Sequence, residues 1–255
     1  MKKILAMLLA LVMVLSLAAC ASTPAADTPA ESTSTTETPV TETPASAEET
    51  PAADGKTYTV GVCQLVQHEA LDAATQGFVD ALTEELGDAV TIDVQNASGD
   101  SVNCGTIVNG FVSRGVDLIM ANATPALTAA VSATADIPIL GTSITAYGVA
   151  LDLDDFNGTV GGNVSGSSDL ADLQKQAQMI LDWFPETKNV GLLFCSAEPN
   201  SRYQIDEVRK ALEAQGVTCE EFAFTDSNDV SSVTQKAADF SDVVYVPTDN
   251  TAASN

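Results

Sequence analysis

Basic residues are scarce in this chain. Only 10 of its 255 residues are Lys or Arg, against 35 Asp or Glu, and the formal net charge is −25. Proteins that bind DNA or RNA need Lys and Arg to neutralise phosphates. Because the sequence has no basic stripe, nucleic acid is excluded as a partner. The acidic surplus indicates solubility and says little about a ligand, since a helix N-terminus can bind a carboxylate even in an acidic protein.

The sequence also lacks the motifs of common enzymes. It contains no Gly-x-Ser-x-Gly elbow, no phosphate-binding loop and no cluster of metal-ligating residues. No known motif places a Ser or Cys and an acid around its one histidine, His68, which is therefore not expected to act as a general base. We predict that the chain is not an enzyme and needs no cofactor and no metal.

The cysteines follow no metal-binding pattern. The spacings of Cys63, Cys104, Cys195 and Cys219 match no zinc site and include no Cys-x-x-Cys pair. Cys63 and Cys195 lie within apolar strand patterns, where a free cysteine commonly serves as a small buried hydrophobe. A disulfide between two of the four stays open, and no functional prediction depends on it.

The N-terminus indicates export and a lipid anchor. Lys2 and Lys3 precede an apolar run, residues 4–19, that is too short for a stable membrane span. The run ends in Leu-Ala-Ala before Cys20, which resembles the lipobox of bacterial lipoproteins and implies diacylglycerol on the Cys20 sulfur. An ordinary secretory signal with an incidental cysteine is the alternative. The lipobox predicts a lipid-anchored protein on the extracellular face of the bacterial cell membrane.

Residues 21–56 form a stalk between this signal and the folded part. The stretch consists mostly of Thr, Pro, Ala, Ser and Glu and has no aromatic residue. Such a composition cannot bury enough apolar surface to offset the entropy of ordering the chain. We therefore predict that the stalk is disordered.

From residue 57 onwards, short apolar runs alternate with amphipathic segments. The expected strands span residues 58–65, 90–94, 116–121, 137–141, 190–195, 220–224 and 243–247. The expected helices span residues 70–86, 102–114, 125–134, 170–184, 203–215 and 229–240. This alternation predicts an α/β fold with parallel, doubly wound sheets. The nearly unbroken apolar run at residues 190–195 is typical of a strand covered on both faces.

The alternation lapses in the glycine-rich stretch of residues 142–169, which is expected to cross between two lobes. We predict lobe 1 at residues 57–145, the crossover at 146–168 and lobe 2 at 169–255. Lobe 2 receives three strands, fewer than the ~5 or 6 of an average sheet. We therefore expect lobe 2 to be incomplete. Truncation of the sequence is the favoured explanation, and completion of the lobe by a partner is the alternative.

Polar turns follow several of the expected strands. In open parallel sheets, such turns and the free N–H groups of the next helix converge on one ligand crevice. The turns are Gln64-Leu65-Val66-Gln67-His68, Asn122-Ala123-Thr124-Pro125, Ser196-Ala197-Glu198-Pro199-Asn200-Ser201 and Pro247-Thr248-Asp249-Asn250. The pattern predicts that several of them line one cleft.

Taken in order with the lipobox, the stalk and Gly162-Asn163-Val164-Ser165-Gly166, these turns resemble the substrate-binding lipoproteins of ABC importers of the tryptophan/tyrosine type. The resemblance covers residue 58 to the end of the sequence. It implies a type I periplasmic-binding-protein fold: two lobes that close on a small solute, often an aromatic amino acid, and present it to a membrane permease. A surface sensor or receptor lipoprotein with the same clamp is the alternative, and the resemblance does not choose the ligand.

The resemblance also suggests roles for single residues. Asp249 is expected to pair with a ligand ammonium, or only to cap the following helix. Thr124, with the N–H groups beside Ala123, is expected to hold the ligand carboxylate, unless it is a plain helix cap. Asn200 and Ser201 could hold the same carboxylate from the other lobe, or are likewise caps.

Weaker candidates complete the predicted site. Glu198 could assist with the ammonium, although an exposed turn glutamate is the more common case. Tyr147 could stack on an aromatic ligand or simply pack in the crossover. The remaining candidate contacts are His68, Gln64, Ser196 and Thr248. Trp183, on a helical stripe with Ile180, is expected in the core.

Overall fold

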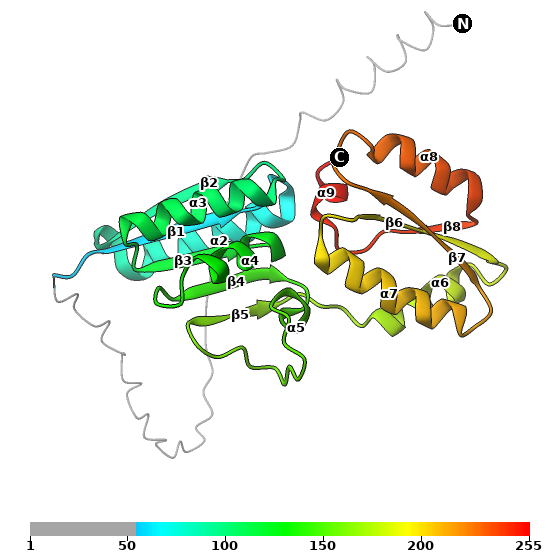
Figure 1. Cartoon of the computed structure of the whole chain (residues 1–255), viewed down its shortest axis with the longest axis horizontal. Coiled ribbons are helices and arrows are strands. Elements are labelled where there is room, and N and C mark those ends of the chain that lie inside the picture. Colours follow the sequence, from blue (N-terminus) through cyan, green and yellow to red (C-terminus); the bar gives the residue numbers. More distant parts are fainter. Residues whose placement is uncertain (1–54) are drawn as a thin grey trace, which may run out of the picture. The chain divides into compact units, whose positions relative to one another are not determined.

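The structure, a computed structural model, describes residues 55–255 of the chain. The predicted signal peptide, the lipidation site at Cys20 and the stalk up to residue 54 lie outside the described residues. Within the described part, two parallel sheets flanked by helices make up the architecture (Figure 1).

The first sheet has five parallel strands in the order β2-β1-β3-β4-β5. Its strands are β1 (Tyr58–Gln64), β2 (Val90–Asn96), β3 (Leu118–Asn122), β4 (Ile139–Ile144) and β5 (Val164–Ser168). Its helices are α2 (Glu69–Leu86), α3 (Ser101–Arg114), α4 (Thr124–Ala133) and α5 (Tyr147–Ala150), with a 3-10 turn at Gly87–Ala89. Phe111 and Leu127 are fully buried in the larger core, while Phe78 of α2 packs against a second cluster that contains Val62 of β1. Apolar residues on both faces of β1 therefore explain why helices cover both sides.

The second sheet has three parallel strands in the order β7-β6-β8. Its strands are β6 (Asn189–Cys195), β7 (Thr218–Phe224) and β8 (Val243–Tyr245). Its helices are α6 (Leu173–Trp183), α7 (Pro199–Glu213), α8 (Val230–Phe240) and α9 (Asn250–Ala253). Leu192 and Phe194 of β6 belong to the core cluster shared with α6 and α7, whereas Leu193 and Cys195 pack in the cluster that includes Ala237 of α8. The central strand is thus covered on both faces, as its apolar run predicted.

The stretch between residues 142 and 169 contains more structure than expected. Helix α5 lies at its start, and β5 pairs with β4 as the edge strand of the first sheet. The prediction that this stretch is only a crossover was therefore wrong for residues 164–168. Gly166 has a φ of 152°, and a Cβ there would lie 2.1 Å from the carbonyl oxygen of Gly141. Because another backbone approaches β5 this closely, the strand consists mostly of glycine and serine. It therefore lacks the apolar pattern by which a strand is recognised in a sequence.

The position of Trp183 also corrects the sequence analysis. Leu173, Ala177 and Ile180 of α6 are buried, but Trp183 is 71% exposed and Phe184 is 49% exposed. The last turn of α6 thus extends past the core. No helix of the described residues is long and apolar enough to cross a bilayer.

Candidate ligand-binding site

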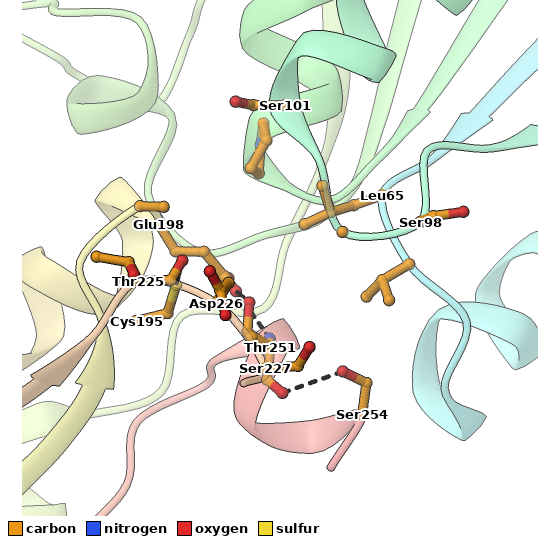
Figure 2. A pocket seen from close by; sticks show the side chains of 14 residues that line it. Leu65, Ser98, Ser101, Cys195, Glu198, Thr225, Asp226, Ser227, Thr251 and Ser254 are labelled. Atoms are coloured by element: carbon orange, nitrogen blue, oxygen red, sulfur yellow. Dashed lines mark hydrogen bonds between the residues drawn. The ribbon is translucent and has the colours of Figure 1, made fainter. Parts of the chain in front are cut away.

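Turns at the carboxyl ends of the strands line a cavity of about 150 Å³ (Figure 2). From the first sheet come Leu65, Val66, Ser98, Gly99, Ser101 and Pro125. From the second sheet come Cys195, Ala197, Glu198, Thr225, Asp226, Ser227, Thr251 and Ser254. A cavity of this volume in another protein holds benzene. The space therefore suits a small ring or a short side chain.

Glu198 is the predicted site residue that lies directly in the cavity wall. It precedes α7 and is 3% exposed, so the expectation of an exposed turn glutamate was wrong. Its Oε2 accepts hydrogen bonds from the backbone N and the Nδ2 of Asn250, at 3.1 and 2.7 Å. Its Oε1 accepts from the N and Oγ1 of Thr251, both at 2.8 Å. The carboxylate is thereby held against the first turn of α9.

Asp249 lies beside Glu198 and caps α9, as the structural alternative predicted. Its Oδ1 accepts from the backbone N of Ala252 at 2.8 Å, and its Oδ2 from that of Cys195 at 2.6 Å. Burial, followed by the negative charge of Glu198, raises the pKa of the Asp249 carboxyl above its ordinary value. Asp249 is 4% exposed and lies behind the wall of the cavity, so it acts on the cavity chiefly through its charge.

The acidic pair, Glu198 and Asp249, lacks a basic counterpart in the cavity. No Lys, Arg or His is among the described residues that line it. Backbone and side-chain donors hold the two carboxylates in place but bring no positive charge. Because buried negative charge is costly unless it is paired, a ligand with an ammonium group would complement this end of the site.

The turn between β3 and α4 is built differently. Ala123 has φ 88° and ψ 156°, a backbone region that favours glycine and costs other residues about 1–3 kcal/mol. Thr124 follows at the start of α4 and is 2% exposed, and its Oγ1 has no hydrogen-bond partner. Pro125, next along the helix, lines the cavity. A buried free hydroxyl beside helix N–H groups is suited to a carboxylate.

Asn200 and Ser201 are turned towards the acidic pair. The Nδ2 of Asn200 donates to Glu198 Oε2 at 3.2 Å and to the carbonyl oxygen of Thr248 at 3.0 Å. Ser201 is fully buried, and its Oγ accepts from Asn200 Nδ2 at 3.4 Å. The Asn200 amide donor is thus used by residues of the second sheet's turns, which argues against the carboxylate role suggested for Asn200 and favours a role in holding Glu198.

The remaining predicted contacts are scattered. The Nε2 of His68 lies 3.3 Å from Asn250 Oδ1, which brings His68 close to the acidic pair. Gln64 is buried at the end of β1, where its Nε2 donates to Asp72 Oδ1 and its Oε1 accepts from Thr75 Oγ1, at 2.6 Å each. Gln64 therefore lies outside the cavity wall.

Tyr147 and Ser196 also make structural contacts. Tyr147 is 6% exposed and donates to the carbonyl oxygen of Gly141 at 3.0 Å, so it packs, but in the core of the first sheet and not in a separate crossover. Burial raises the pKa of its phenol to about 12. The Oγ of Ser196 donates to the carbonyl oxygen of Phe224 at 3.1 Å and ties the start of its turn to β7.

Two turns of the cavity wall were missed by the sequence analysis. Ser98 and Ser101 follow β2, and Thr225, Asp226 and Ser227 follow β7. Both turns are polar stretches that come directly after expected strands. The rule that selected the other turns, polar residues at the carboxyl end of a parallel strand, would have found them too.

The chain matches known proteins over most of the described part. A family model described as ABC transporter substrate binding protein matches residues 59–255. A tyrosine-binding protein of Clostridioides difficile (strain R20291) is 35% identical in an alignment 217 residues long that covers 83% of this chain and 62% of that protein. The chain thus spans less than two thirds of the length of this relative.

Solved structures show the same fold. An ABC domain from Streptococcus pneumoniae in complex with L-Trp is 36% identical with a TM-score of 0.73, and the likeness covers 78% of this chain and 68% of that one. A leucine-binding protein from Thermotoga maritima is 15% identical with a TM-score of 0.54, and the likeness covers 74% of this chain and 55% of that one. At 15% identity the second likeness shows the fold alone. The predicted α/β fold of the type I periplasmic binding proteins is confirmed.

Proposed function

The chain belongs to the family of ABC transporter substrate-binding proteins, and on this premise we propose that it captures an aromatic α-amino acid outside the cell and delivers it to a membrane permease. The family consists of binding proteins, so the chain is not an enzyme. The proposed ligand has three parts: an ammonium, a carboxylate and a ring.

One observation carries this proposal. The cavity wall contains the buried carboxylate of Glu198, with the buried carboxylate of Asp249 behind it, and no basic residue is among the described residues of the wall. The β3–α4 turn adds the opposite polarity beside the wall: Thr124, which directly precedes the lining residue Pro125, has a hydroxyl without a partner at the N-terminus of α4. An α-amino acid carries a cation and an anion on one carbon atom, so its two charges match the two polarities of the site.

Three findings favour an aromatic side chain. The relative from Clostridioides difficile is a tyrosine-binding protein, and the structure from Streptococcus pneumoniae contains L-Trp. The volume of about 150 Å³ also suits a ring. We propose further that Cys20 carries a lipid that tethers the protein to the extracellular face of the membrane, since the lipobox at residues 17–20 predicts it.

A thermal melt of the chain with L-tyrosine, L-tryptophan and L-leucine tests the ligand. A ligand at ~100 times its dissociation constant stabilises the folded state by about 2.7 kcal/mol. We expect tyrosine or tryptophan to raise the melting temperature more than leucine does. A larger shift with leucine would refute the aromatic proposal, and a cooperative melt that none of the three changes would refute the amino-acid proposal.

A further inference from the structure

A hydrogen bond joins the two sheets beside the candidate site. The Nε2 of His68, in the turn between β1 and α2, lies 3.3 Å from the Oδ1 of Asn250, the first residue of α9. Within residues 55–255, no other side-chain hydrogen bond or ion pair links a strand, helix or turn of the first sheet with one of the second. The contact is therefore made only when the turns of the two sheets meet.

His68 can make this contact because its side chain does not cap its own helix. The residue precedes α2 with extended backbone angles, φ −160° and ψ 162°, and its side chain makes no capping hydrogen bond. Ser, Thr, Asp and Asn are the usual residues at such a position. The carbonyl oxygen of His68 accepts from the backbone N of Asp72 at 2.9 Å, which anchors the turn. The backbone of His68 thus belongs to α2, while its imidazole reaches the second sheet.

The side-chain amide of Asn250 has one orientation that suits both of its neighbours. Its Nδ2 donates to Glu198 Oε2 at 2.7 Å, and a reversed amide would place two oxygen atoms against each other there. Oδ1 therefore faces His68. Because an amide oxygen only accepts, the Nε2 of His68 must carry the proton. Two successive hydrogen bonds thus connect His68 through Asn250 to the carboxylate of Glu198.

We propose that His68 is a positioning residue for the ligand ammonium: its Nε2–H fixes the amide of Asn250, and through it the carboxylate of Glu198, when the two sheets close on the ligand. His68 is not among the described residues that line the cavity, so it acts without touching the ligand. The distance of 3.3 Å is at the long end for N–H···O, which leaves room for closure to shorten the bond. This inference rests on the proposed capture of an amino acid.

The proton on Nε2 can be observed directly. His68 is the only histidine in the sequence, so the ring signals of the full chain without a histidine tag are unambiguous. Proton–nitrogen NMR of the imidazole is recorded at mildly alkaline pH, where an imidazole is neutral, without and with L-tyrosine. We expect a slowly exchanging proton on Nε2 that strengthens with tyrosine and disappears in Asn250→Ala. A proton on Nδ1, no N–H signal in either state, or a signal that Asn250→Ala leaves unchanged would overturn the proposal.

Three variants separate a positioning role from a merely structural one. His68→Ala should lower the affinity for L-tyrosine by about 2- to 12-fold, the range for one neutral hydrogen bond, mainly through faster dissociation. His68→Gln, whose amide keeps a donor, should restore most of the affinity. Gln76→Ala is the control, because it removes a hydrogen bond within α2, to Asp80, and should leave affinity intact. Full affinity in His68→Ala, or an equal loss in His68→Gln, would contradict the positioning role.

A double-mutant cycle tests whether His68 acts through Asn250. In the Asn250→Ala chain, His68→Ala should lower the affinity for tyrosine no further. Losses that multiply would show that the two residues act separately, and the proposal would fail. If tyrosine does not bind the unaltered chain, the proposed ligand is wrong, and the imidazole signal with its loss in Asn250→Ala still decides whether His68 holds Asn250.

Discussion

The acidic half of the candidate site and its β3–α4 half differ in whether their polar atoms have hydrogen-bond partners within the protein. Each carboxylate oxygen of Glu198 and Asp249 accepts at least one hydrogen bond from the protein. Thr124 Oγ1, by contrast, is buried without a partner, next to the strained backbone of Ala123. The acidic half is thus positioned by the fold but still needs a positive charge. In the β3–α4 half, the hydroxyl of Thr124 is free to hydrogen-bond the ligand.

Removing the charge of Glu198 should have the largest effect. In Glu198→Gln the charged contact to the ligand ammonium is lost, at roughly 1.5–3 kcal/mol or about 10- to 150-fold in affinity for L-tyrosine. Isothermal titration calorimetry measures the affinity, and a melt without ligand checks the fold. Asp226→Asn is the control, because Asp226 is an exposed carboxylate of the same cavity wall and should matter much less. Equal losses in the two variants would contradict the special role of Glu198.

Thr124→Val should separate affinity from stability. The free hydroxyl makes no bond within the protein, so its removal should leave the free energy of unfolding unchanged or raise it. Affinity should fall by about 12-fold, the lower end of the range for a hydrogen bond to a charged group, because the lost bond joins a neutral hydroxyl to the ligand carboxylate. Thr128→Val, on the same helix, removes a hydroxyl that donates to the carbonyl oxygen of Thr124 at 3.0 Å. This control should leave affinity intact, and a stability loss without an affinity loss in Thr124→Val would argue for a purely structural hydroxyl.

Acid should weaken binding through Asp249. Its pKa is raised in the folded protein, so as pH falls this carboxyl takes up a proton before an ordinary carboxyl does. The same proton uptake stabilises the ligand-free fold in that pH window, and this stabilisation is lost as pH rises through the raised pKa. Affinity and ligand-free stability should therefore change in opposite directions with pH. Asp249→Asn should flatten both profiles, and an unaltered affinity profile in that variant would assign the effect to another group.

Ala123→Gly should have the smallest effect. Glycine adopts φ 88° without strain, but the change loses a buried methyl worth about 0.8 kcal/mol and adds freedom to the unfolded chain. These contributions nearly cancel, so the free energy of unfolding should change by less than ~1 kcal/mol. Ala126→Gly, at a fully buried position within α4, should cost more because no strain is relieved. Denaturant titration of both variants measures the difference, and equal costs would show that Ala123 stores no strain.

Much of the fold could be predicted because its strands are strongly apolar. The run at residues 190–195 indicated a strand buried on both faces, and β6 is one. β5 could not be recognised, because its small residues allow the backbone of Gly141 to come close and do not form an apolar pattern. The exposure of Trp183 depends on where α6 leaves the core, which its apolar stripe does not reveal.

The turns that form the site could be predicted, but the hydrogen bonds between their side chains could not. Glu198, Asp249 and Thr124 were selected because polar residues at strand ends converge in parallel sheets, and of the three Glu198 lines the cavity. Which of them faces the cavity, and which is saturated with hydrogen bonds, depends on side-chain directions that a sequence does not contain. Asn200 illustrates this limit, because its donors go to Glu198 and Thr248.

Recognition of both charges of an amino acid is the central claim, and calorimetric titration of the full chain with three related ligands tests it most directly. L-tyrosine has both charges, tyramine lacks the carboxylate, and 3-(4-hydroxyphenyl)propionate lacks the ammonium. We predict that tyrosine binds most tightly, that tyramine is weaker, and that the propionate is weakest, because the buried carboxylates Glu198 and Asp249 then remain unpaired. Binding of the propionate as tight as that of tyrosine would contradict the account.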